Sequence, residues 1–85
     1  MYHCYILYSS KLDRYYVGST ADLQRRMQQH NSRKRHHYTS NANDWQLKYN
    51  EALPTRAQAQ RRERQIKGMK SRAYIERLVD RQHEA

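Results

Sequence analysis

The sequence has no phenylalanine, one cysteine, one proline and two glycines among its 85 residues. Because Cys4 is alone, neither a disulfide within the chain nor a cysteine zinc cluster can form, and we expect Cys4 to be a small core residue. No apolar run approaches the ~18 residues that a membrane span requires. The N-terminus also shows no charged segment followed by an apolar stretch, as a signal peptide would. We therefore expect a soluble cytoplasmic protein, associated with the nucleoid if it is bacterial.

Acidic residues are also scarce, with 8 Asp and Glu against 17 Lys and Arg and a formal net charge of +9. This surplus of positive charge favours a polyanionic partner, above all nucleic acid. Charge alone does not separate a nuclease from a non-catalytic binding module, or from a protein that associates with RNA or the ribosome. The length predicts one domain with a small core, over residues 1–80, followed by a tail over 81–85.

Tyrosine is abundant, with 8 residues that supply much of the apolar bulk, and each buried phenol needs a hydrogen-bond partner. Residues 2–9 place bulky side chains at alternate positions on both faces, which predicts a strand covered on two sides. A polar turn over 10–14 and a second strand over 15–19 complete a hairpin, in which Tyr5 and Tyr16 can lie near each other. We expect Gly18 to end the second strand, where a glycine permits a sharp or left-handed turn or the close approach of a ligand.

A basic amphipathic helix is predicted to follow over 22–30, and Asp22 is one of its candidate N-caps. Arg26 and His30 are i, i+4 neighbours on the flank of its apolar stripe, so we expect Arg26 to point inward and Arg25 outward. The remaining predicted elements are a loop over 31–44, a strand over 45–52, a helix over 56–69 and a short final helix over 72–79. The expected fold is α/β in the α+β sense: a small, mainly antiparallel three-stranded sheet flanked by helices, in the order ββαβαα.

Glu63 is the only acidic residue in the predicted helix over 56–69, and its position makes it half-face the core. One interpretation is an i, i+4 ion pair with Lys67, which contributes about 0.2–0.5 kcal/mol. The other is that Glu63 binds a divalent cation, because a partly buried carboxylate is costly unless it meets a positive charge.

The other candidate residues have equally ordinary interpretations when each is taken alone. Tyr5 and Tyr16 can be core residues, and Arg26 can be one more exposed cation. His30 can be a surface histidine at a helix end, stabilised by the helix dipole, or a proton carrier near neutral pH.

The order of these residues resembles that of the GIY-YIG nuclease family over residues 2–79. It is most similar to the small single-domain bacterial members, which are related to the N-terminal nuclease domain of a bacterial excision-repair enzyme. The positions that match the family's motifs are Tyr5, Tyr16-Val17-Gly18, Arg26, His30 and Glu63. The first motif departs from the family in reading His3-Cys4-Tyr5, and no asparagine follows Glu63.

The resemblance implies a metal-dependent endonuclease that hydrolyses phosphodiester bonds in DNA, in repair, recombination or the processing of incoming DNA. Glu63 would hold one Mg²⁺ or Mn²⁺ ion, Arg26 would neutralise charge on the phosphate, and the Tyr5/Tyr16 pair or His30 would move the proton. The DNA is single-stranded, double-stranded or branched, and this domain or a partner protein selects the target. The alternative is a non-catalytic nucleic-acid-binding module that keeps the same fold.

The basic surface is predicted to bind the phosphate backbone without reading sequence. Two aromatic side chains, Tyr38 and Trp45, are candidates for stacking on unpaired bases, although core packing is the favoured interpretation for Trp45. The residues assigned to nucleic-acid binding are Arg25, Arg33, Lys34, Arg35, Tyr38, Arg62 and Lys67.

Overall fold

The computed structural model describes residues 1–31 and 42–84. Four of the residues assigned to nucleic-acid binding lie outside these described residues: Arg33, Lys34, Arg35 and Tyr38.

The described chain folds into three strands and three helices in the predicted order ββαβαα. They are β1 (Tyr2–Ser9), β2 (Arg14–Thr20), α1 (Leu23–His30), β3 (Gln46–Leu53), α2 (Arg56–Gly68) and α3 (Arg72–Glu84). The strands form one sheet in the order β2-β1-β3, and β1 pairs antiparallel with both neighbours. The predicted fold class is therefore confirmed.

Side-chain caps explain where the three helices begin. Asp22, Thr55 and Ser71 each accept a hydrogen bond from the backbone N–H three residues further along the chain, at 3.0, 3.2 and 3.1 Å. Such caps satisfy one of the otherwise unpaired N–H groups of a first helical turn. Within the described ranges, none of the helices has the length and apolar character needed to cross a membrane.

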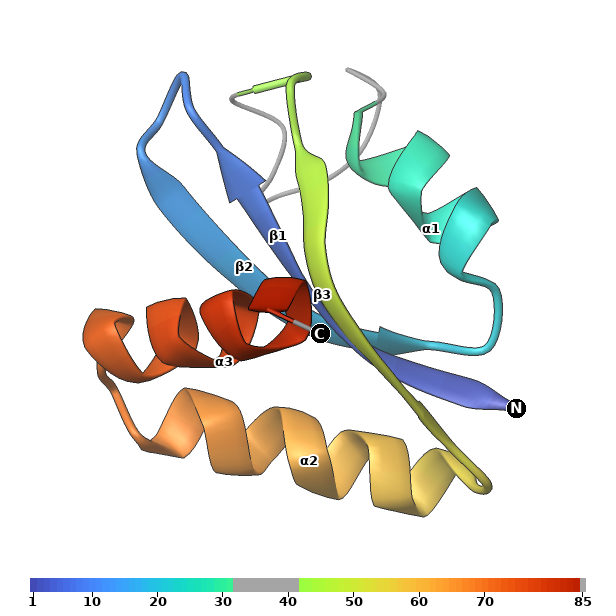
Figure 1. The fold of residues 1–85 in the computed structure, drawn as a ribbon. Coiled ribbons are helices and arrows are strands. Elements are labelled where there is room, and N and C mark those ends of the chain that lie inside the picture. Colours follow the sequence, from blue (N-terminus) through green and yellow to red (C-terminus); the bar gives the residue numbers. More distant parts are fainter. Residues whose placement is uncertain (32–41, 85) are drawn as a thin grey trace.

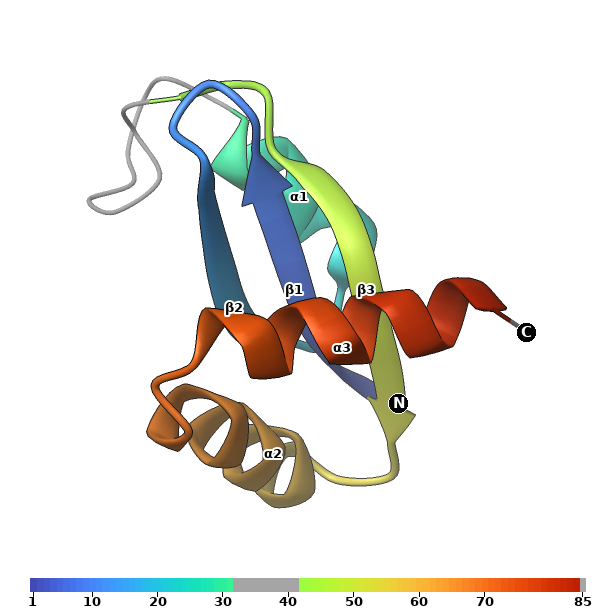
Figure 2. The same cartoon turned by 60° about the vertical axis from the view of Figure 1, so that its left-hand side comes forward.

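The alternating side chains of β1 divide the interior into two cores, one on each face of the sheet. Cys4 and Ile6 pack with residues of α2 and α3 on one face, whereas Leu7 packs with Trp45 and Met27 of α1 on the other. Figures 1 and 2 show the same layers, with α1 and α3 on opposite sides of the sheet and α2 running along one end of it. Burial confirms that Cys4 is a core residue and raises the pKa of its thiol to about 12.

The C-terminal helix is longer than predicted. We expected it to end at residue 79 before a frayed tail, but α3 continues to Glu84. The Gln82 amide accepts a hydrogen bond from the Asn50 N–H at 3.0 Å and donates one to the Asn50 carbonyl at 2.8 Å. Because β3 is an edge strand, these backbone groups have no strand partner, and Gln82 satisfies them while tying the end of α3 to the sheet.

Candidate active site

Tyr5 and His30 form a buried pair between β1 and the end of α1. Only 1% of Tyr5 and 3% of His30 is exposed, and the Tyr5 hydroxyl is 2.9 Å from His30 Nε2. The alternative that His30 is a surface helix-end residue is therefore wrong. Burial raises the pKa of Tyr5 well above its ordinary value of 10, the nearby Tyr16 raises it further, and the charge of Arg26 partly opposes both effects. Tyr5 is thus a neutral phenol at physiological pH, and its hydroxyl is in hydrogen-bond contact with the imidazole.

Tyr16 completes an aromatic cluster on the same face of the sheet. Its ring centroid lies 6.3 Å from that of Tyr5, 4.8 Å from that of His30 and 6.4 Å from that of Trp45. Tyr16 precedes Gly18 by two residues along β2, and Gly18 pairs directly with Tyr5. The predicted proximity of the two phenols follows from this register, because side chains two residues apart on a strand share one face. Tyr16 is less buried than Tyr5.

Gly18 provides space for this aromatic cluster, which is not the role that we predicted for it. It is not a strand end or a left-handed turn, because β2 continues to Thr20 and no described glycine has a positive φ. A Cβ at this position would instead lie 2.6 Å from the Tyr5 hydroxyl oxygen, 2.8 Å from Tyr5 Cζ and 3.0 Å from Cε2 of Tyr16. The missing side chain is what lets both rings pack against the strand.

Glu63 projects from α2 and is held by two partners. The Ser19 hydroxyl of β2 donates a hydrogen bond to Oε1 at 2.7 Å, and the Lys67 ammonium lies 2.7 Å from Oε2. The Glu63 side chain is 22% exposed, so it is half-buried as predicted, and the i, i+4 pair with Lys67 is also present. Sequence reasoning missed the contact between Ser19 and Glu63.

The Glu63 carboxylate lies beside the aromatic cluster. The Lys67 ammonium is 2.7 Å from Glu63 Oε2 and 5.8 Å from the Tyr16 ring centroid, so this oxygen is at most 8.5 Å (2.7 plus 5.8) from that centroid. The negative charge of Glu63 also contributes to raising the pKa of Tyr5. Because β2 is an edge strand, groups on its two faces can meet around it.

Arg26 adds a guanidinium to this arrangement from α1. It is half-buried whereas Arg25 is exposed, which confirms the predicted inward and outward directions. The charge of Arg26 lowers the pKa of Tyr5, so the two side chains are close enough to interact. Arg26 and Ser19 also line one groove between α1 and α2. The structure therefore gathers the predicted phenols, imidazole, guanidinium and carboxylate into one region.

Several residues assigned to nucleic-acid binding have other roles or lie elsewhere. Arg62 donates from Nε to both carboxylate oxygens of Glu51, at 3.1 and 3.0 Å, on the side of α2 that faces β3 and α3. The structure does not bring Arg62 to the site. Trp45 is buried in the core beside Leu7, as its favoured interpretation predicted. Arg25 lines the groove.

Comparison with known proteins shows the family to which this fold belongs. A family model described as the GIY-YIG catalytic domain matches residues 1–76. This chain belongs to the GIY-YIG family. It is 37% identical over 78 residues to UPF0213 protein VNG_2274C from Halobacterium salinarum, an alignment that covers 92% of this chain and 99% of that protein. It is also similar to the solution NMR structure of UPF0213 protein BH0048 from Bacillus halodurans, with a TM-score of 0.58, 33% identity, and coverage of 94% of this chain and 84% of the other.

Membership of the GIY-YIG family confirms the predicted resemblance and indicates a nuclease-type function with a nucleic-acid substrate. The names of the two UPF0213 relatives assign no activity.

The GIY-YIG site offers one carboxylate to a metal ion. Within the described residues, no group of three or more His, Cys, Asp or Glu side chains could hold a metal. Magnesium nevertheless keeps several waters and is often bound through one carboxylate plus substrate phosphates. Oε2 of Glu63 already attracts a cation, the 50% exposed Lys67 ammonium, and an exposed ion pair of this kind contributes only about 0–1 kcal/mol. The residues present therefore fit one divalent ion whose other ligands are water and substrate.

Proposed function

We propose that this GIY-YIG protein is a Mg²⁺- or Mn²⁺-dependent endonuclease that hydrolyses phosphodiester bonds in DNA. The observation that carries the proposal is the position of the half-buried Glu63 carboxylate near a buried Tyr–His pair. The Arg26 guanidinium lines the adjacent groove, to which Ser19, the partner of Glu63, also contributes. DNA repair or recombination is the setting that the family resemblance implies.

Glu63 is the residue that holds the ion in this proposal, and Ser19 fixes its orientation. The hydrogen bond from Ser19 to Oε1 leaves Oε2, which faces the exposed Lys67, as the oxygen for the ion. When bound, a divalent ion supplies charge stabilisation to the reacting phosphate and its leaving oxygen. Arg26 binds a nonbridging phosphate oxygen, because a guanidinium matches phosphate geometry in a bidentate way.

Tyr5 and Tyr16 have different roles in the proposed reaction. Tyr5 is unsuited to accept a proton, because burial raises its pKa above an already high ordinary value. Its hydroxyl lies 2.9 Å from His30 Nε2, and this hydrogen bond holds the imidazole in place. Tyr16, which is less buried and lies nearest the Lys67 charge, is the phenol that we assign to the attacking water.

Cleavage of supercoiled plasmid and of labelled single-stranded DNA tests the proposal, with Mg²⁺, Mn²⁺ or EDTA. We expect the wild type to cut in either metal and EDTA to stop it. Glu63→Gln should cut at least about 100-fold more slowly, since removal of a charged group that stabilises the transition state costs about this much. Glu76→Gln, on α3, removes the same charge and a comparable i, i+4 ion pair, and it should cut like the wild type.

Cleavage by Glu63→Gln at the wild-type rate, or full activity in EDTA, would show that the proposed site is wrong. If the wild type and both variants bind DNA equally but none cuts any substrate, the non-catalytic binding module is the correct alternative.

A further inference from the structure

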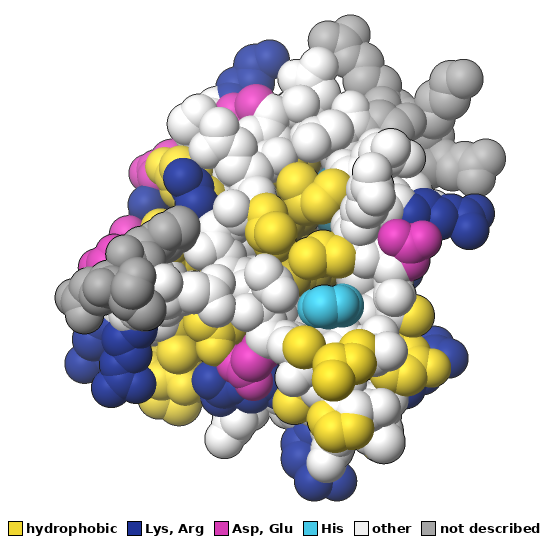
Figure 3. Space-filling view, turned by 45° about the vertical axis from the view of Figure 1, so that its right-hand side comes forward, with side chains coloured by type: hydrophobic (Ala, Val, Ile, Leu, Met, Phe, Trp, Pro, Cys, Tyr) yellow, Lys and Arg dark blue, Asp and Glu magenta, His cyan; other side chains and the backbone are white. Residues whose placement is uncertain are grey.

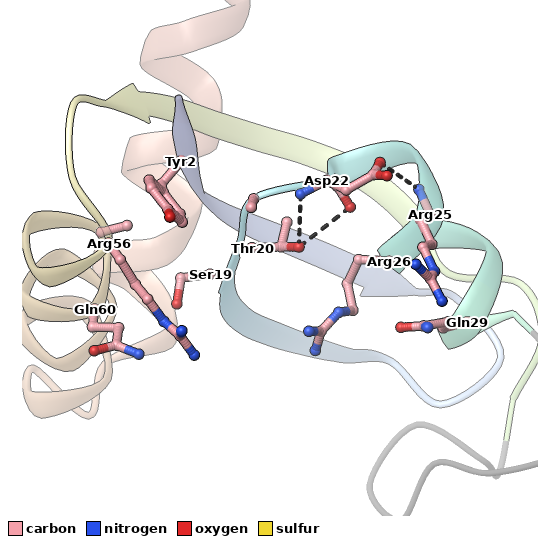
Figure 4. A pocket seen from close by; sticks show the side chains of 11 residues that line it. Tyr2, Ser19, Thr20, Asp22, Arg25, Arg26, Gln29, Arg56 and Gln60 are labelled. Atoms are coloured by element: carbon pink, nitrogen blue, oxygen red, sulfur yellow. Dashed lines mark hydrogen bonds between the residues drawn. The ribbon is translucent and has the colours of Figure 1, made fainter.

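The groove beside the candidate active site has two facing walls. Arg56 and Gln60 project from α2 on one side, and Arg25, Arg26 and Gln29 project from α1 on the other (Figure 4). The ends of β1 and β2 lie between these walls and contribute Tyr2, Ser19 and Thr20. The groove encloses about 370 Å³, near the lower end of the roughly 300–1,000 Å³ of small-ligand sites. This volume suits one nucleotide unit better than a double helix.

The residues that line the groove give it a net positive charge. Three guanidinium groups, of Arg25, Arg26 and Arg56, line it against one carboxylate, of Asp22, which leaves a formal charge of +2 (3 minus 1). Oδ1 of Asp22 is already engaged, because it accepts the N-cap hydrogen bond from the Arg25 N–H. In the described part of the chain, the arginine ion pairs are formed by Arg62 and Arg72 and not by the three groove arginines.

The placement of these arginines opposes helix stability, which points to a role outside the fold. Arg56 is the first residue of α2 and Arg25 lies in the first turn of α1, and neither first turn contains an acidic residue. A cation is unfavourable at the positive end of a helix dipole by about 0.3–1 kcal/mol. The start of α2, capped by the uncharged Thr55, therefore adds to the positive potential of the groove, whereas the Asp22 carboxylate at the N-cap of α1 offsets the positive end of that helix.

Positive charge does not cover the face shown in Figure 3 evenly. On the face shown in Figure 3, basic side chains lie mainly at the rim, while hydrophobic and neutral side chains occupy the centre. On that face, the overall charge of the protein does not produce a uniformly basic surface.

Two residues connect the groove to the candidate active site. Ser19 lines the groove and donates a hydrogen bond to Glu63, and Arg26 lines the groove and lowers the pKa of Tyr5. A strand whose phosphate lies at Glu63 can therefore continue into the groove. Tyr2 offers an aromatic ring in the groove, and aromatic rings bind unpaired bases by stacking.

We infer that this groove binds the nucleotide adjacent to the scissile phosphate in single-stranded DNA, with its phosphate between Arg56 and Arg25 and its base on Tyr2. This inference rests on the proposed function for its position in the reaction, but the binding itself does not require cleavage. The groove accepts an unpaired strand in preference to a duplex, because its volume admits one nucleotide and its aromatic ring needs an exposed base.

Binding in EDTA separates this inference from the nuclease proposal. Fluorescence anisotropy would measure the affinity of the full chain for a labelled oligothymidylate of about 10 nucleotides over a range of salt concentrations. Arg56→Ala should weaken binding roughly tenfold, as expected for loss of a charged hydrogen bond to phosphate. It should also reduce the slope of log affinity against log salt by about 0.7, the value for one phosphate contact on a single strand. Arg77→Ala, which removes an exposed arginine from α3, is the matched control and should leave affinity and slope nearly unchanged.

Stacking and fold integrity are tested in parallel. Tyr2→Ala should weaken binding about fivefold or more, whereas Tyr2→Phe should retain it. The melting temperature of Arg56→Ala should equal or exceed that of the wild type, because the change removes a cation from the start of α2. A lowered melting temperature would instead mean that Arg56 is structural.

Equal effects of Arg56→Ala and Arg77→Ala, or an unaffected Tyr2→Ala, would overturn the inferred site. Equal weakening of duplex and single-stranded binding would overturn the preference for an unpaired strand. If the groove variants lose binding while the wild type cuts no DNA, the groove stands and the nuclease proposal fails.

Discussion

Replacing Gly18 by alanine places a methyl group where the buried Tyr5 ring packs. The new Cβ would lie 2.6 Å from the Tyr5 hydroxyl oxygen and 2.8 Å from Cζ, against 3.4–4 Å for ordinary contact. The hydroxyl must therefore move by about 0.8 Å (3.4 minus 2.6), although only 1% of Tyr5 is exposed and its hydroxyl bonds to His30. Overpacking of this kind costs about 1–3 kcal/mol, partly offset by the 0.4–1 kcal/mol that alanine gains by restricting the unfolded chain.

We expect Gly18→Ala to lower the free energy of unfolding by about 1–2 kcal/mol, which corresponds to a fall of about 4–16 °C in melting temperature for a domain of this size. Urea and thermal denaturation would measure it. Gly68→Ala is the control, because its added Cβ meets nothing within 4 Å and its position ends α2. The same chemical change there should leave stability unchanged or raise it by up to about 1 kcal/mol.

A double-mutant cycle with Tyr5→Leu identifies the cause. Without the ring and hydroxyl, the methyl group at position 18 has space, so Gly18→Ala should cost much less in the Tyr5→Leu background. An unchanged cost in that background, or wild-type stability of Gly18→Ala alone, would refute the packing argument.

Two further predictions concern charged groups. The Lys67→Ala variant should bind Mn²⁺ up to about fivefold more tightly than the wild type, as measured by calorimetry without DNA. The reason is that the Lys67 ammonium lies 2.7 Å from Oε2 of Glu63 and competes with the metal for that oxygen. Unchanged or weaker binding of Mn²⁺ would contradict this. The Ser9 hydroxyl, followed by the Lys11 N–H, lowers the pKa of Asp44 below its ordinary value of 3.8. The stability that this carboxylate contributes is therefore present above pH 3.8 and is lost as the pH falls through the lowered value. Asp44→Asn should be less stable than the wild type near neutral pH, with a difference that shrinks in acid; a constant difference would argue against the assignment.

The local signals in the sequence were sufficient for most of the fold. Alternating bulky residues along 2–9 predicted a strand covered on both faces, and both faces of β1 are covered. Asp22 and Thr55 are side chains that favour helix starts, and they cap α1 and α2. The end of α3 could not be predicted, because Gln82 is held by Asn50, 32 residues away in the chain.

For the candidate site too, the sequence predicted some features and not others. Its motif residues follow from the family resemblance, and the inward direction of Arg26 follows from helical spacing. The link between Ser19 and Glu63 spans 44 residues and depends on how α2 packs against β2, so a serine in a strand gives no signal of it. The role of Gly18 depends on the strand register that sets it opposite Tyr5, and spacing along the chain does not specify that register.

The central claim is that Glu63 and Arg26 act on one phosphate as parts of a single site. Single-turnover cleavage rates of the wild type, Glu63→Gln, Arg26→Ala and the double variant test it most directly, since residues that act as a unit have non-additive effects. We predict that each single variant loses most of the activity and that the double variant is little worse than the slower single variant. Losses that multiply in the double variant, or a single variant that cuts like the wild type, would contradict the account.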